Sequence, residues 1–233
     1  MKRKFHYFGL NRFERALWTL SVLVMLAGYW LAPDGGILNL TASLIGVTAL
    51  IFVSKGYVIG QILTVIFAVF YGIISFEQRY YGEMITYLCM TAPISLLSII
   101  SWMRHPYEGT KEVEVGTLNS RQCLFLVLAS AATTALFYFI LKALGTANLF
   151  FSTISVTTSF LASALTYFRS SCYALGYAAN DVVLIVLWLM AAANDPSCLV
   201  MAACFLMFLA NDLYGYFNWQ RIKRRQAIDR IYS

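Results

Sequence analysis

Eight apolar segments, each long enough to cross a lipid bilayer, follow one another with short polar breaks between them. They lie at about residues 17–32, 37–53, 57–76, 82–102, 121–143, 149–168, 172–193 and 197–219. A hydrocarbon core needs about 20 apolar residues per spanning helix, so eight such helices take up most of the 233 residues. Only 12% of the residues are charged, whereas about 25% is usual in soluble domains. The sequence therefore predicts an all-α polytopic membrane protein without a soluble catalytic domain.

The basic residues predict the orientation of these helices. With eight helices both termini lie on one side, and fifteen of the seventeen Lys and Arg residues then share that side. Only Arg79 and Lys142 lie on the other. Cytoplasmic loops carry the excess of Lys and Arg in membrane proteins, so we expect both termini in the cytoplasm. The same placement explains the net charge of +6 without a nucleic-acid partner.

The chain contains a weak internal repeat. Tyr57-x-x-Gly60 opens one segment and Tyr173-x-x-Gly176 opens another, and each following segment ends at a tryptophan, Trp102 or Trp219. Both copies begin on the same side of the membrane, which indicates two parallel three-helix repeats, a recognised transporter plan. The division that we predict is a tail and extra helix (1–36), a first repeat (37–104), a linker and connecting helix (105–148), a second repeat (149–221) and a basic tail (222–233).

Polar residues inside the apolar segments are the candidate site residues. Asn and Asp are costly in hydrocarbon and by default indicate a functional site. The residues that we expect to bind a solute are Asn180, Asp181, Trp188, Asn211, Tyr214, Gln61, Tyr57, Thr64 and Tyr87.

Each of these residues also has a structural interpretation. The two asparagines could join helices, Asp181 could accept structural hydrogen bonds, and Trp188 could simply pack. Hydroxyl groups in 149–168 should mostly bond their own backbone or a neighbouring helix. We expect Tyr80, Tyr81, Trp102 and Trp219 to lie in interfacial aromatic belts, and Glu83 to be solvated near the outer surface.

The candidate residues indicate the kind of solute. They combine aromatic rings, amides and carboxylates, and no Arg or Lys lies in mid-membrane to hold a phosphate. This pattern favours a flat ring that is neutral or cationic, because a cation is attracted to an aromatic face. No Walker A motif and no constellation of metal ligands or catalytic groups occurs, so we expect no cofactor, no metal and no enzymatic activity.

The stretches YVIGQILTVIFAVFYG and QRYYGEMITYL, with the two Trp-ended helices, resemble the PnuC-type vitamin transporters over about residues 37–221. These are bacterial importers of nicotinamide riboside, with relatives for thiamine or riboflavin. The resemblance implies a SWEET-like 3+1+3 arrangement with an extra N-terminal helix, located in the inner membrane. It also implies facilitated diffusion followed by cytoplasmic phosphorylation, and a homotrimer.

The two repeats differ in the residues that this resemblance uses. Thr64 stands where the second repeat has Asn180, and Gly72 stands where it has Trp188, so the second repeat should supply most ring and amide contacts. Transport of thiamine or another flat vitamin remains an alternative. A membrane-embedded enzyme or a non-transporting subunit is a further one.

Overall fold

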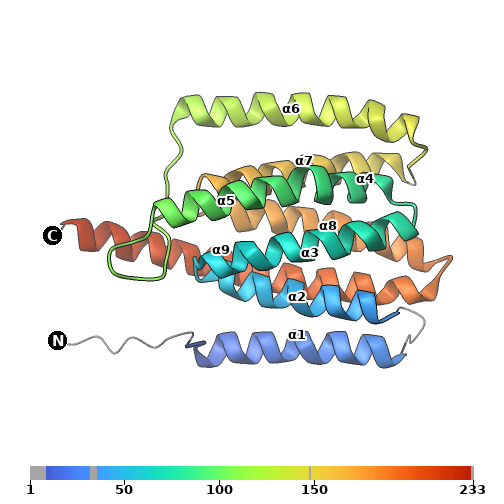
Figure 1. Ribbon diagram of the computed structural model, residues 1–233, viewed down its shortest axis with the longest axis horizontal. Coiled ribbons are helices and arrows are strands. Elements are labelled where there is room, and N and C mark those ends of the chain that lie inside the picture. Colours follow the sequence, from blue (N-terminus) through green and yellow to red (C-terminus); the bar gives the residue numbers. More distant parts are fainter. Residues whose placement is uncertain (1–8, 32–35, 147, 232–233) are drawn as a thin grey trace.

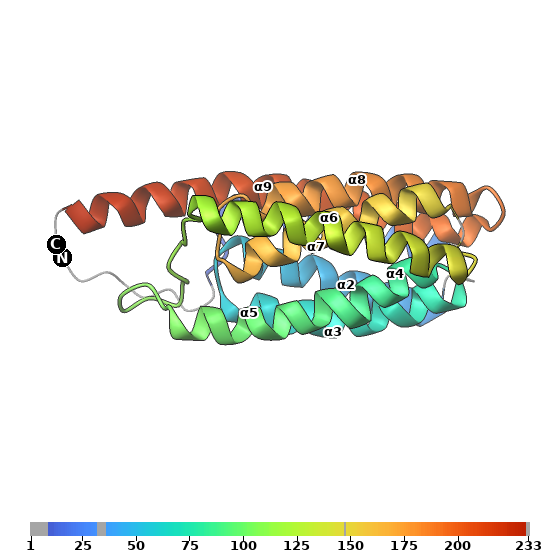
Figure 2. The same cartoon turned by 90° about the horizontal axis from the view of Figure 1, so that it is seen from above.

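The computed structural model describes residues 9–31, 36–146 and 148–231, and within these ranges the chain is helical apart from its connections. Figure 1 shows the helices side by side along the long axis, and Figure 2 shows the same bundle from above. They are α1 (Arg12–Leu31), α2 (Gly36–Ser54), α3 (Val58–Glu77), α4 (Tyr81–Ile85), α5 (Ala92–Arg104), α6 (Ser120–Ala143), α7 (Leu149–Tyr167), α8 (Tyr173–Ala192) and α9 (Leu199–Ile231).

Seven helical stretches in the described ranges are long and apolar enough to cross a membrane. One of them, Tyr81–Arg104, joins α4 and α5 into a single span. The helix α1, which has 20 residues, packs along α2 and α9 outside this set of seven. The predicted all-α membrane fold is therefore confirmed, while the eighth span stays a prediction.

A π-helical turn, Thr86–Thr91, links α4 to α5. It directly precedes Pro93, which has no N–H to give to the carbonyl group four residues earlier. Helices commonly absorb such an interruption by a π-bulge. The wider turn places Tyr87 and Thr91 on the same side of the helix, facing the middle of the bundle.

The tryptophans that end the two predicted repeats are buried, with exposed fractions of 1% for Trp102 and 0% for Trp219. The indole N–H of Trp102 donates to the carbonyl of Thr166 at 3.0 Å. That of Trp219 donates to the carbonyl of Val53 at 2.9 Å. Each predicted repeat therefore contacts the end of the first helix of the other, and the two rings lie 5.5 Å apart. Their predicted placement in aromatic belts is wrong, because each indole has a buried carbonyl partner.

Two clusters of buried side chains fill the bundle at different depths. The linker-end cluster contains Val53, Trp102, Val113, Tyr173 and Trp219, near the loop 105–119. The far-end cluster includes Phe67, Tyr71, Tyr80, Tyr87, Trp188, Phe205 and Phe208. Tyr80, also predicted in a belt, is buried here and donates its hydroxyl to the carbonyl of Leu187 at 3.1 Å.

The helix α9 continues beyond its apolar part to Ile231, through residues that the sequence analysis treated as a tail. The side chain of Gln226 accepts from the N–H of Val115 at 2.8 Å and donates to the carbonyl of Val113 at 3.1 Å. Arg225 and Arg230 pair with Glu112 and Glu114 of the same linker. These contacts with the linker stabilise the charged C-terminal part of α9.

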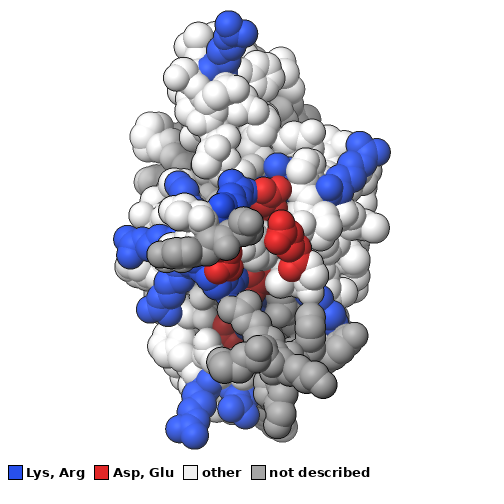
Figure 3. Space-filling view, turned by 90° about the vertical axis from the view of Figure 1, so that its left-hand side faces the viewer, with Lys and Arg blue, Asp and Glu red and all other residues white. Residues whose placement is uncertain are grey.

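Figure 3 looks onto the end of the bundle that carries this linker, and Lys and Arg side chains are spread over it. The predicted charge asymmetry also counted Lys2, Arg3 and Lys4, which lie outside the described residues. The predicted loop at Pro33 also lies outside the described residues.

Candidate functional site

A small internal cavity lies where α2, α3, the π-helical turn, α8 and α9 meet. Its volume is about 40 Å³, which is enough for about one water molecule. The cavity lies between the two clusters, since Val53 belongs to the linker-end cluster and Phe67, Tyr87 and Phe208 belong to the far-end cluster. The described residues that line it are Gly46, Ala49, Leu50, Val53, Gln61, Thr64, Phe67, Tyr87, Thr91, Tyr177, Asp181, Phe208 and Asp212.

Four of the predicted site residues meet at this cavity: Gln61, Thr64, Tyr87 and Asp181. The hydroxyl of Thr64 donates to the carbonyl of Gly60 at 2.9 Å, so its donor is already used. In contrast, Oε1 of Gln61 and Oδ2 of Asp181 are buried and receive no N–H or O–H from the described residues. These two oxygens are the acceptors that a bound solute would find open.

A second carboxyl group, that of Asp212 of α9, lines the same cavity as Asp181. Both residues are only 3% exposed. Two carboxyl groups at one buried site do not readily ionise together, because like charges repel. The pair therefore carries at most one negative charge.

Asp212, Tyr177 and Thr91 were not among the residues predicted from the sequence to form the site. The spacing Tyr177–Asp181 and Phe208–Asp212 was a usable signal, because residues four apart share one face of a helix. The buried side of each helix contacts several neighbours, so the sequence alone did not show which part of it lines a cavity.

Asn180 lies next to Asp181 but points to α7. Its side-chain oxygen accepts from three hydroxyls of α7, Ser155, Thr158 and Ser159, at 3.1, 2.9 and 3.0 Å. The other hydroxyls of α7 mostly bond their own backbone, as expected from the sequence.

Glu83 joins the same polar group, since Ser155 also donates to its Oε2 at 3.2 Å. It is 0% exposed, so its predicted solvation near the outer surface is wrong. It lies on the side of α4 that faces α7, which covers it.

Trp188 lies in the far-end cluster, outside the lining of the cavity. Its indole N–H donates to the hydroxyl of Tyr71 at 2.8 Å, and its ring lies 5.4 Å from that of Tyr80. The position of Trp188 helps to close the bundle on that side of the cavity.

Asn211 and Tyr214 face α1 instead of the cavity. Asn211 donates to the hydroxyl of Ser21 at 3.1 Å. Tyr214 donates to Glu14 at 2.8 Å, and Lys55 pairs with the same carboxylate at 2.9 Å. Glu14 therefore joins α1 to both predicted repeats.

Tyr57 precedes α3 and lines a separate groove with Trp102 and Pro106 near the linker. Burial, together with the nearby carboxylates of Glu112 and Glu14, raises the pKa of its phenol. The residue is therefore part of the contact between the linker and the first predicted repeat.

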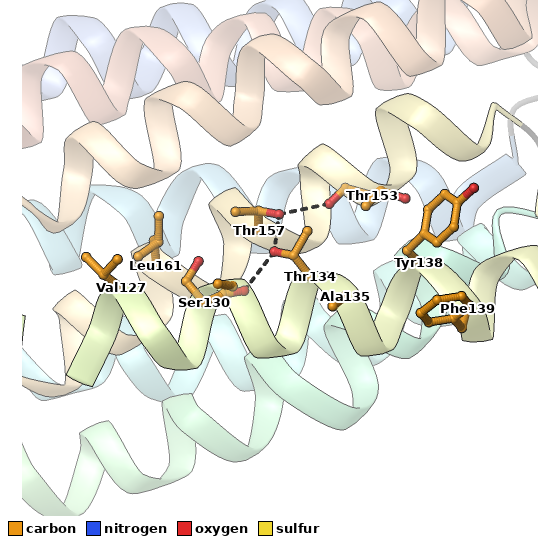
Figure 4. Close-up of a pocket in the computed structure, with 10 residues that line it drawn as sticks. Val127, Ser130, Thr134, Ala135, Tyr138, Phe139, Thr153, Thr157 and Leu161 are labelled. Carbon is orange, nitrogen blue, oxygen red and sulfur yellow. Dashed lines mark hydrogen bonds between the residues drawn. The ribbon is translucent and has the colours of Figure 1, made fainter. Parts of the chain in front are cut away.

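A larger hollow of about 720 Å³ lies between α6 and α7 (Figure 4). Its threonine hydroxyls are already engaged: those of Thr134 and Thr157 lie 2.6 Å apart, so that one donates to the other, and each also lies within hydrogen-bond distance of a carbonyl of its own helix. The large apolar side chains Val127 and Phe139 on its rim are exposed. This hollow offers a polar solute little, and it suits lipid chains or apolar side chains.

The apolar spans of the described ranges, with buried carboxyl and amide groups at a cavity between them, are the arrangement expected of a polytopic membrane transporter. A family model described as "Nicotinamide mononucleotide transporter" matches residues 36–221, and the chain belongs to this family.

The relatives with known names agree with this family. The chain is 29% identical to the nicotinamide riboside transporter PnuC of Neisseria mucosa, over 94% of this chain and 85% of that protein. It is 24% identical to the PnuC of Haemophilus influenzae, over 93% of both chains. The crystal structure of "the Vitamin B3 transporter PnuC" matches with a TM-score of 0.83 at 25% identity, covering 94% of this chain and 95% of the other.

Proposed function

We propose that this protein imports nicotinamide riboside across the bacterial inner membrane by facilitated diffusion. The observation that carries the proposal is the cavity, which combines aromatic rings with open amide and carboxylate oxygens. Nicotinamide riboside has a cationic pyridinium ring, a carboxamide and a ribose, which these groups suit. Two relatives are named as transporters of this compound.

The charge of the cavity separates the riboside from the mononucleotide named in the family description. A phosphate group is usually held by Arg, Lys or a helix N-terminus. The described lining has two carboxyl groups and no Lys, Arg or His. Burying a phosphate beside them would be unfavourable, so the riboside is the better substrate.

The bundle around the cavity supports alternating access. A volume of about 40 Å³ is far below the roughly 300 Å³ or more of ordinary ligand pockets. The helices must therefore separate to admit a nucleoside. We propose that the linker-end cluster and the far-end cluster open in turn, with Trp188 in the far gate.

The reciprocal tryptophans support a SWEET-like 3+1+3 plan in which α2–α5 and α7–α9 are parallel repeats, α6 connects them and α1 is added. In this plan Gln61, Thr64, Tyr87 and Asp181 contact the solute. Asn180 joins α8 to α7, Asn211 and Tyr214 join α9 to α1, and Tyr57 contacts the linker.

The proposal includes both termini in the cytoplasm, supported by the many basic residues at the linker end. Import would be completed by a separate cytoplasmic kinase, whose product carries a phosphate that the cavity does not suit. The homotrimer implied by the resemblance is part of the proposal, and the mass of the detergent-solubilised protein by light scattering tests it. A mass that corresponds to one chain would contradict the homotrimer.

The test is uptake of labelled nicotinamide riboside by proteoliposomes that contain the purified protein. We expect saturable uptake, competed by unlabelled riboside and only weakly by the mononucleotide. Thiamine and riboflavin are included as competitors, and stronger competition by thiamine would reassign the substrate to the alternative vitamin. No saturable uptake of riboside would contradict the proposed function.

A further inference from the structure

We infer that Asp181 and Asp212 select for the positive charge of the substrate's ring, so that the cationic riboside is carried in preference to an uncharged molecule of the same shape. This inference rests on the proposed function and names what the site recognises. The matched uncharged molecule is the dihydro form of nicotinamide riboside. It keeps the carboxamide and the ribose but has lost the charge of the pyridinium.

The first observation is the pair of carboxyl groups. They come from neighbouring helices, α8 and α9, and both line the same cavity at 3% exposure. Keeping a charged carboxylate out of water is costly unless it is paired. Among the described residues around the cavity there is no basic side chain to pair with it.

The second observation is independent of the acids and comes from α3. Oε1 of Gln61 also lines the cavity, is buried, and has no hydrogen-bond partner in the described chain. Buried polar atoms are rarely left without a partner in native structures. Together, Gln61 and Asp181 present unsatisfied negative or partly negative oxygens to whatever enters.

The charges match in number. Two carboxyl groups that line one buried cavity do not readily ionise together, because like charges at one site repel, so the pair has one negative charge to offer. One pyridinium ring brings one positive charge and balances it. A neutral ring would bury the same acids without any counter-charge.

The aromatic part of the lining favours the same ligand. Tyr87 and Phe67 lie with their rings 5.9 Å apart at one side of the cavity, and Phe208 lies 5.3 Å from Phe67. Aromatic faces attract a cation as well as providing a surface for stacking. A ring that is both flat and cationic uses the acids and the aromatic groups at once.

The test compares the two riboside forms as competitors of labelled nicotinamide riboside uptake in proteoliposomes held at zero membrane potential. For the unaltered protein we expect the cationic form to compete at least about tenfold better than the dihydro form, the size expected for an ion pair combined with a cation–π contact. In the double variant Asp181→Asn/Asp212→Asn the ratio should fall toward one, because no carboxyl group is left in the described lining. The replacements keep the shape of both side chains and remove their charge.

Glu83→Gln is the matched control, because Glu83 is also a buried acid but lies against α7, outside the lining. It should keep the ratio of the unaltered protein. Equal competition by the two forms in the unaltered protein would overturn the inference even if the double aspartate variant does not fold. An unchanged ratio in the folded double variant would overturn it too.

The two proposals fail in different ways. Absence of any riboside uptake contradicts the proposed function, whereas uptake without discrimination by charge contradicts only this inference. Sodium and potassium chloride are tested separately, and loss of the discrimination at raised sodium would show that the acids hold an inorganic cation instead of the ring.

Discussion

At the scale of single residues, the two Asn–Asp pairs divide their side chains between different neighbours. Asn180 bonds α7 and Asn211 bonds α1, whereas Asp181 and Asp212 line the cavity. Adjacent residues on a helix point about 100° apart, so only one member of each pair can face the cavity. The sequence showed that the pairs were significant, but which member faced the cavity depends on how the helices pack.

Replacement of Gln61 by Leu should weaken riboside uptake about tenfold, because a buried hydrogen-bonding group facing the solute is lost. The comparison is Thr64→Val on the same helix, whose hydroxyl already bonds the carbonyl of Gly60. Initial uptake rates over a range of riboside concentrations give the KM of each variant. An equal loss in both variants would contradict the role of Gln61 as an open acceptor.

The contact between Glu14, Lys55 and Tyr214 should matter for stability. Glu14 is 2% and Lys55 15% exposed at the side chain, and breaking one side of a buried pair costs about 3 kcal/mol. Glu14→Gln should therefore lower the melting temperature. The double variant Glu14→Gln/Lys55→Gln should be less destabilised than the sum of the two single variants. Additive changes in the melting temperatures would show that the pair contributes no coupling.

At the scale of elements, the repeated Tyr-x-x-Gly motif corresponds to two close helix contacts. A Cβ at Gly60 would lie 2.5 Å from the backbone nitrogen of Val53, and one at Gly176 would lie 2.9 Å from the Cα of Ala162. The crossings of α3 with α2 and of α8 with α7 therefore both need glycine. Small residues commonly allow such close packing in membrane proteins.

Gly60→Ala and Gly176→Ala should each lower the melting temperature, since backbone atoms would have to move apart. Gly28→Ala is the control, because its added Cβ would meet only Val200 atoms at 3.5 Å or more. Thermal unfolding monitored by intrinsic fluorescence compares the three. A larger loss in Gly28→Ala than in the other two would refute this explanation.

The linker depends on Gln226, which is 3% exposed and bonds the backbone of both Val113 and Val115. Gln226→Ala should release this segment, and hydrogen–deuterium exchange at 113–115 should become faster. Arg230→Ala is the comparison, because an exposed ion pair contributes little. Protection unchanged in Gln226→Ala would mean that other contacts hold the linker.

The helices themselves followed from the sequence, because long apolar runs and the Gly, Pro and Ser breaks between them mark spans clearly. The π-helical turn and the extension of α9 did not. The π-helical turn depends on how the helix accommodates Pro93. The extension of α9 depends on contacts with a linker more than 100 residues away in the sequence.

At the scale of the whole molecule, the structure is a helical bundle with a small cavity between its two clusters of buried side chains. Gln61, Thr64, Tyr87 and Asp181, which the sequence predicts as solute-binding residues, line this cavity, and their role in binding stays a prediction. The sequence could not place Trp188 or Tyr214, since a residue on an inner face can contact any of several helices. That choice is made by packing between distant segments.

The most direct test is a structure of the protein bound to nicotinamide riboside. The account predicts ligand density between α3, α8 and α9, with the ring near Asp181 and a polar group within hydrogen-bond distance of Oε1 of Gln61. Density beside Asn211 and α1, or in the hollow between α6 and α7, with the cavity at Gln61 and Asp181 still closed, would contradict it.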